Sequence, residues 1–279
     1  MLRSATIDLS FPWVVSEGGY EWRVGKGSKA LLCERNLRDV CWRVYQPLLE
    51  YPALFREFAE LEGLDQIRKF ADQHGVLFGN YSPADHVVGR GKYYSVGAAF
   101  GTTLNAWAQE IADISFLIDI WESIEAGRIN KLRNLILWRE GGAVEYQLVT
   151  PKRRNWKLLA RAGAAHASKE GEVLNPARYV LQRELNDRLS NENASSGGRS
   201  DGVSYAPRLL RRADGTLHLI ARPRNLLSAI WLQFAQVVGG SYELRRCPIC
   251  HRHFLPKRTD AITCTDVCRQ KKSRNARCS

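Results

Sequence analysis

The sequence predicts an α+β protein: a mixed, helix-rich N-terminal domain, then a β-hairpin, a helix and a small cysteine-rich module. Three observations support this class. Near the N-terminus apolar and polar residues alternate, which is typical of strands. Through much of the chain apolar residues recur at three- and four-residue spacing, which is typical of helices. At the C-terminus, five of the seven cysteines fall within residues 245–279.

The composition is that of a globular protein with a strong positive charge. Hydrophobic residues make up 44% of the 279 residues and charged residues 25%, which leaves enough apolar surface for a core. The formal net charge of +12 attracts polyanions, with nucleic acid first and an anionic membrane surface second. Because the sequence shows neither an apolar run of membrane-spanning length nor a signal-peptide pattern, we expect a cytoplasmic protein without a membrane partner.

The first part of the chain begins with strands and continues with helices. Residues 1–28 alternate in polarity around a Gly-Gly turn, which predicts a strand or hairpin. Apolar residues at helical spacing over 31–48 predict a helix, in which Cys33 and Cys41 would be buried free thiols. Two shorter helices are predicted between residues 54 and 74.

The strongest helical signal spans about 103–127 and predicts the central helix of the first domain. The acidic side chains of this helix have no histidine near them in the sequence, so we expect a solvated face and not a catalytic site. These acids are Glu110, Asp113, Asp119, Glu122 and Glu125. A helix or strand is predicted over 129–138, and alternation predicts a strand over 144–150.

The stretch PKRRNWKLLAR, residues 151–161, combines five Lys or Arg residues with Trp156. Two interpretations stay open. A basic run with an aromatic residue could contact nucleic-acid phosphates or stack on a base. Alternatively, the stretch is the solvated start of a helix, with Trp156 packed in the core.

Four segments divide the chain. Residues 1–190 would form the α+β domain, whose last helix starts at Asn175-Pro176. Residues 191–202 are polar, small and glycine-rich, which is typical of a linker or surface loop. Residues 203–240 contain a predicted hairpin around an Asp-Gly turn and an apolar helix, and residues 241–279 contain the cysteine module.

Two close pairs of cysteines dominate the last segment: Cys247 with Cys250, and Cys264 with Cys268. The two residues inside the first pair let one tight turn present both sulfur atoms to an ion. The four-residue spacing of the second pair puts both sulfur atoms on one face of a helix. The sequence therefore predicts one structural Zn²⁺ held by four thiolates. The alternatives are a histidine, His251 or His253, in place of one cysteine, and a site without metal.

The segments around the cysteines complete the predicted module. Residues 253–255 and 261–263 are predicted to pair as a short hairpin, and Thr263 or Thr265 to cap the helix that follows. Phe254 is expected to fill the small core. A knuckle, a hairpin and a helix with the last two ligands make a treble-clef arrangement.

The module is also strongly basic, with ten Lys or Arg and two Asp over residues 245–279, a net charge of +8. Its last helix is basic nearly all round. A solvated face would mix charges of both signs, so we predict contacts with nucleic-acid phosphates. The predicted contact residues are Arg245, Arg246, Lys257, Arg258, Arg269, Lys271, Lys272, Arg274 and Arg277.

The pattern CPIC…F…TCTDVCRQKKSRNAR resembles the bacterial treble-clef zinc fingers of the CGNR type. The resemblance covers about the last 35 residues and places the four cysteines at the ligand positions and Phe254 at the core aromatic. After Cys268 the chain reads Arg-Gln-Lys where that family has Gly-Asn-Arg. The resemblance implies a C-terminal finger that binds DNA in a transcriptional regulator.

These observations together predict a zinc-stabilised nucleic-acid-binding protein, with DNA preferred to RNA and a regulatory role. The N-terminal domain would sense a ligand or mediate assembly. Two alternatives come from other classes. One is a nuclease or other nucleic-acid-processing enzyme docked by its finger, and the other is a protein-interaction adaptor whose charge aids solubility. No catalytic residue is predicted.

Overall fold

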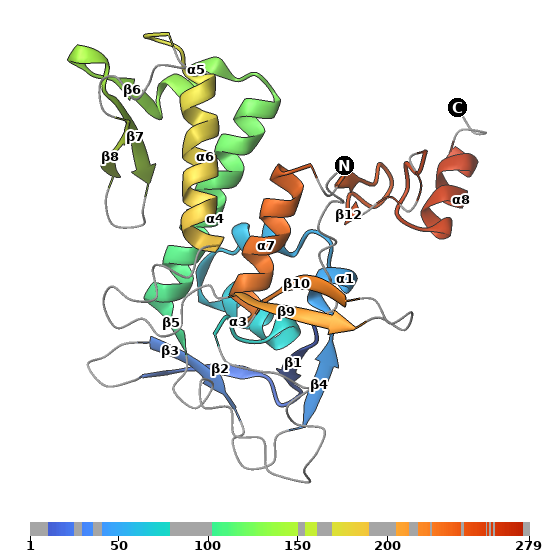
Figure 1. Cartoon of the computed structure of the whole chain (residues 1–279). Helices are drawn as coiled ribbons and strands as arrows, with labels where there is room; N and C mark the ends of the chain where they lie inside the picture. The colour runs from blue at the N-terminus through green and yellow to red at the C-terminus, as the bar shows by residue number, and fades with distance from the viewer. Residues whose placement is uncertain are drawn as a thin grey trace.

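The computed structural model of the chain contains both helices and strands, which confirms the α+β class (Figure 1). It describes residues 11–24, 30–35, 41–78, 102–149, 154–160, 169–189, 205–211, 217–223, 225–240, 243–254, 256, 258 and 260–275. The strands are β1 (Trp13–Ser16), β2 (Tyr20–Val24), β3 (Ala30–Glu34), β4 (Trp42–Tyr45), β5 (Thr102–Thr103), β6 (Ile136–Trp138), β7 (Val144–Val149), β8 (Arg154–Ala160), β9 (Tyr205–Arg211), β10 (Leu217–Pro223), β11 (Arg245–Arg246) and β12 (His253–Phe254). The helices are α1 (Pro47–Glu50), α2 (Leu54–Ala59), α3 (Gly63–His74), α4 (Leu104–Glu125), α5 (Ile129–Arg133), α6 (Leu174–Leu189), α7 (Leu226–Val238) and α8 (Asp266–Asn275).

Two small antiparallel sheets form near the N-terminus. Strand β1 pairs with β4, and β2, β3 and β5 form the second sheet in that order. The helix predicted over 31–48 is therefore wrong, because β3 and β4 occupy this stretch. Its valine and aromatic side chains favour strands, and pairing with β1 and β2 outweighs the helical spacing. Cys33 is buried in β3 as expected, whereas Cys41, just before β4, is exposed.

Helix α4 lies against α2 and α6 and contributes many buried residues to the main core (Figure 1). The Oγ1 atom of Thr103 accepts a hydrogen bond from the Ala106 amide at 3.2 Å and so caps the start of the helix. The central helix predicted over 103–127 is confirmed. The helices predicted between 54 and 74 and from Asn175-Pro176 are confirmed as α2, α3 and α6.

Helix α7 is buried on nearly every side and belongs to the same hydrophobic cluster as the N-terminal helices. The Phe234 and Phe55 rings stack at 5.2 Å between centroids, joining α7 to α2. A helix that is apolar all round is expected inside a core or a membrane. Within the described ranges, however, no helix is both long and apolar enough to cross a bilayer. The hairpin predicted before α7 is confirmed, since β9 and β10 pair along their whole length.

A buried ion cluster joins α4 to α6 and contradicts the expectation that the acids of α4 are all solvated. Glu110 and Asp113 are 5% and 7% exposed, and both pair with Arg188 of α6. The Arg188 Nη1 atom lies 2.8 Å from Glu110 Oε2, and Trp231 Nε1 of α7 donates to the same oxygen at 3.3 Å. Burial raises the pKa of Asp113, which the Arg188 charge partly offsets. The sequence spacing cannot show this pairing, because the cation is contributed by a distant helix.

Strands β6, β7 and β8 form an antiparallel sheet next to α6. The described part of the 151–161 stretch is therefore a strand and not the start of a helix. Trp156 is 41% exposed, so the interpretation that placed it in the core is wrong. The strand predicted over 144–150 is confirmed as β7, and the 129–138 stretch divides into α5 and β6.

The ion cluster predicts a large loss of stability in Arg188→Ala. This change leaves Glu110 and Asp113 buried without a cation, and breaking a buried pair on one side costs about 3 kcal/mol. Urea unfolding of the full chain measures the loss. Arg178→Ala, which removes an exposed arginine from the same helix, should change the free energy of unfolding by less than about 0.5 kcal/mol. Equal effects of the two substitutions would show that the cluster does not stabilise the fold.

Candidate metal centre

The four paired cysteines converge on one point. One ligand atom from each of Cys247, Cys250, Cys264 and Cys268 lies within 4.8 Å of every other. The site is built from two pieces of chain, the turn between β11 and β12 and the start of α8. The four cysteines could therefore bind a metal ion such as zinc.

The first pair of cysteines lies in the turn of a tight hairpin. The Cys247 amide donates to Arg252 O, and the His251 amide donates to Cys247 O, both at 2.9 Å. Strands β11 and β12 pair in antiparallel fashion, with Arg245 opposite Phe254 and Arg246 opposite His253. The predicted pairing of 253–255 with 261–263 is therefore wrong. The Cys-x-x-Cys turn is itself short enough to reverse the chain, so the strands that flank it pair with each other.

The second pair is placed by the N-terminus of α8. The Thr265 Oγ1 atom accepts a hydrogen bond from the Cys268 amide at 3.3 Å, so Thr265 is the predicted cap. Cys268 lies in the first turn of the helix, whereas Cys264 precedes it. The prediction that both sulfur atoms project from one helical face is wrong for Cys264. Their Sγ atoms still approach to 3.7 Å, because the cap turns the chain tightly at this point.

The sulfur spacings fit four ligands around one ion. Zn–S bonds of about 2.3 Å in a tetrahedron put neighbouring sulfur atoms about 3.8 Å apart. The Sγ atoms of Cys250 and Cys264 are 3.3 Å apart, and those of Cys264 and Cys268 are 3.7 Å apart. A disulfide requires about 2.05 Å, so these cysteines are free thiols at metal-ligand spacing.

The electrostatics of the sulfur atoms favour a cation between them. Burial raises the pKa of Cys247, but amide groups of Cys250, Cys264 and Ile249 outweigh it and lower the value to about 6. Burial and the neighbouring thiols raise the pKa of Cys264 to about 12. Four thiolates repel one another at this distance, and a divalent ion would remove that repulsion.

Neither histidine of the module belongs to the sulfur cluster. His251 is exposed and has a φ angle of 59°, a left-handed conformation that glycine adopts more easily. His253 lies in β12, where burial and then the charges of Arg56 and Arg246 lower its pKa. It is therefore neutral at pH 7 and adds nothing to the charge of the module. The small core consists of Cys247, Phe254 and Cys268, which confirms the packing role predicted for Phe254.

The predicted phosphate-contact residues have two different environments. Lys271, Lys272 and Arg274 are exposed on α8, and no acidic side chain of the described residues forms an ion pair with them. Arg269 is also exposed and lies 3.1 Å from Asp266, an exposed pair of little strength. Lys257 and Arg277 lie outside the described residues.

Of the other predicted contacts, Arg245 and Arg246 hydrogen-bond backbone groups of the module itself, whereas Arg258 does not. Arg245 donates to the Ala261 carbonyl at 2.9 Å and pairs with Glu243 at 2.5 Å. Arg246 Nε donates to the His251 carbonyl at 3.2 Å. Arg258 is exposed and lies 3.5 Å from Asp260. The hydrogen bond from Arg245 to the loop after β12 was not predicted. A basic residue in the sequence does not indicate whether its partner is a phosphate or a backbone carbonyl.

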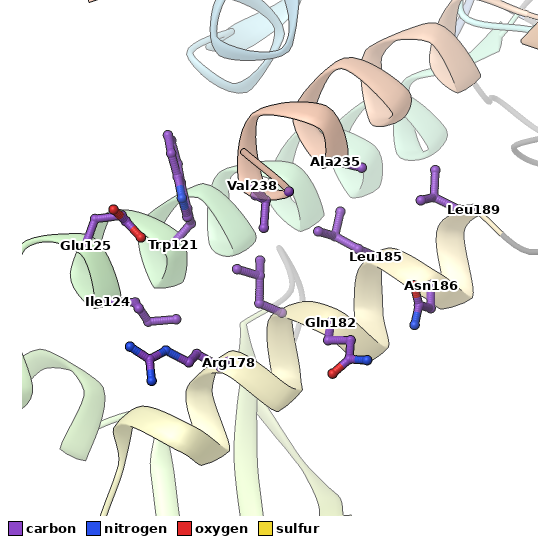
Figure 2. Close-up of a pocket in the computed structure, with 12 residues that line it drawn as sticks. Trp121, Ile124, Glu125, Arg178, Gln182, Leu185, Asn186, Leu189, Ala235 and Val238 are labelled. Carbon is purple, nitrogen blue, oxygen red and sulfur yellow. The ribbon is translucent and has the colours of Figure 1, made fainter. Parts of the chain in front are cut away.

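An open pocket of about 420 Å³ lies between α4, α6 and the end of α7. Leu185 and Val238 point into the space between α6 and α7, and Arg178, Gln182 and Asn186 follow one side of it (Figure 2). Its lining is mainly apolar but includes Glu125, Arg178, Gln182 and Asn186, which suits a small ligand that is largely apolar. The last turn of α7, which lines the pocket, leads directly into the cysteine module.

Comparisons with protein-family models, with curated proteins and with solved structures found no match to this chain.

The ligand set predicts about one zinc ion per chain. Cys264→Ser or Cys268→Ser should markedly lower the zinc that the purified chain retains, because one thiolate is lost and a more weakly bound water or hydroxyl must take its place. Elemental analysis of the purified full chain measures the ratio. Cys41→Ser, which changes an exposed cysteine outside the cluster, should retain the full amount. Full zinc content in both cluster variants would contradict this ligand set.

The left-handed residue of the knuckle gives a second prediction. His251→Gly should strengthen zinc binding about fivefold, because a non-glycine residue in this conformation costs about 1 kcal/mol and binding is coupled to local folding. Competition with a chromophoric chelator measures the affinity. His251→Ala keeps the conformational cost and should change it little. If His251 were a ligand, both substitutions would weaken zinc binding instead.

Proposed function

We propose that this protein is a zinc-stabilised nucleic-acid-binding protein that acts on DNA in a regulatory role. One observation supports this most strongly: a cluster of four sulfur atoms adjoins a helix with three exposed cations that form no ion pair with any described acidic side chain. Zinc bound by four cysteines has no open position for a substrate, so the ion is structural. Its part is to hold α8 in place.

We keep the treble-clef finger as part of the proposal on two of its expected features. A knuckle lies between β11 and β12, and a helix follows that carries the last cysteine in its first turn. The described residues form no separate hairpin between the knuckle and the helix, so the likeness to the CGNR-type fingers rests on these two features and on the four cysteines. We assign the zinc-ligand roles to the four cysteines and the main phosphate contacts to Lys271, Lys272 and Arg274.

Helix α8 has the charge pattern of a phosphate-binding element. Between Asp266 and Asn275 it carries four cations and one acid. Its apolar residues are Val267 and Cys268. Exposed Lys and Arg residues release counterions from DNA when they contact phosphates, which gives salt-dependent affinity. Such contacts position a protein on the backbone without reading sequence.

The regulatory part of the proposal rests on the pocket beside α7. A small, largely apolar ligand there would contact the last turn of the helix that leads into the finger. Filling the pocket would stiffen that turn and change how the finger is presented. This is the ligand-sensing role expected for the N-terminal domain.

An adaptor function has one supporting observation. Ile262 and Val267 are 52% and 63% exposed on the finger. A protein partner held by such apolar side chains would bind with little dependence on salt. Salt dependence therefore separates this alternative from phosphate binding in the same experiment.

Substitution of the α8 cations tests the proposal. The triple variant Lys271→Ala, Lys272→Ala, Arg274→Ala should lose most of the affinity for labelled duplex DNA. The slope of log affinity against log salt should fall by about one for each cation removed. Fluorescence anisotropy across a salt series measures both quantities.

The matched control removes the same charge elsewhere. Lys69, Arg133 and Lys169 are exposed outside α8 and outside the pocket lining, and their replacement by Ala should leave duplex affinity within about twofold. Duplex affinity that is absent at low salt, or that is equal in the two triple variants, would overturn the proposal. Cleavage of the probe on addition of Mg²⁺ would show an enzyme in place of a binding protein.

A further inference from the structure

The sheet β6–β7–β8 presents an exposed aromatic and apolar face. Trp156 and Leu158 are 41% and 45% exposed, whereas Leu159 is 7% exposed. Lys157, on the buried side with Leu159, lies 3.1 Å from Glu184 of α6. Because side chains alternate along a strand, Trp156 and Leu158 share the face that points away from α6.

One described cation lies at this face, and the sequence around β8 is rich in basic residues. Residues 151–161 contain five Lys or Arg and no acid. The Arg139 guanidinium lies over the Trp156 ring, 5.9 Å from its centroid, and is held by Glu145 at 2.7 Å. In the register of the sheet Trp156 is opposite Gln147, whose amide group can also hydrogen-bond a base. An exposed tryptophan therefore lies beside Arg139 on a strand whose sequence is strongly basic.

This combination selects its ligand by chemistry. An exposed aromatic ring offers a stacking surface for a base, and adjacent cations neutralise the phosphates on either side of that base. Inside a duplex both faces of a base are covered by its neighbours, so only an unpaired base can stack on a protein ring. We propose that the outer face of β8 binds single-stranded nucleic acid, with one unpaired base stacked on Trp156. The inference rests on the proposed function for its class of ligand and adds a second surface to it.

The second surface is separate from the finger. Strand β8 and helix α8 lie at opposite ends of the molecule (Figure 1). The two surfaces therefore cannot form one groove around a short duplex. Each should bind its own stretch of nucleic acid, by stacking at β8 and by charge at α8.

Affinity for a short labelled oligothymidylate tests the proposal. In the full zinc-bound chain, Trp156→Leu keeps an apolar side chain of similar reach but removes the ring, and should weaken binding roughly 5- to 100-fold, the range for loss of a base–aromatic stack. Trp156→Phe keeps a ring and should retain most of the affinity. Val24→Ala, an 83% exposed position on a different sheet, should have no effect.

The variants of α8 separate this inference from the proposed function. The α8 triple variant should lose duplex binding but keep affinity for the short single strand within about threefold. Trp156→Leu should lose affinity for the short single strand but keep duplex binding within about threefold. Single-strand affinity that is equal in Trp156→Leu and the unmodified chain would overturn the inference, whatever happens to duplex binding. If Trp156→Leu changed the sedimentation of the chain but not its single-strand affinity, the face would be a contact between copies of the chain. That result would also overturn the inference.

Discussion

The cysteine module has almost no apolar core, so in the proposed function its fold depends on a metal ion bound by the four sulfur atoms. Its buried cluster contains only Cys247, Phe254 and Cys268, with three partly buried neighbours. A core of this size cannot offset the entropy of ordering the chain, whereas a structural zinc ion contributes about 10–16 kcal/mol. In α8, Cys268 is the one buried residue among those whose burial is described. Without the ion, little would hold that helix against the hairpin.

The larger part of the molecule is stabilised differently, and the two parts meet at α7. There an extended apolar core surrounds the Glu110–Asp113–Arg188 cluster, which fixes α6 against α4 and reaches α7 through Trp231. Helix α7 thus has one end in a rigid core and the other at the finger. The two proposed nucleic-acid surfaces lie on either side of this arrangement and would bind through different interactions. One would bind through charge and lose affinity in salt, and the other would bind through stacking and depend on salt less.

How much the sequence revealed depended on whether a pattern was local. The cysteine cluster, the Thr265 cap, the long helix α4 and the β9–β10 hairpin follow from spacing within a few residues, and all were predicted. Strands β3 and β4 were missed because pairing with β1 and β2 overrode a helical spacing of apolar residues. The burial of Glu110 and Asp113 was missed because Arg188 is distant in sequence. The exposure of Trp156 depends on which face of its sheet packs on α6, and a single strand does not specify that.

The central claim is that zinc positions α8 for nucleic acid, and removing the ion tests it most directly. A zinc chelator is titrated into the full chain while duplex affinity and bound zinc are measured together, with the unfolding of the rest of the molecule followed by its tryptophan fluorescence. Duplex affinity should fall in proportion to the zinc removed and return when zinc is restored, while the main core stays folded. Duplex affinity that stays unchanged in the zinc-free chain would contradict it.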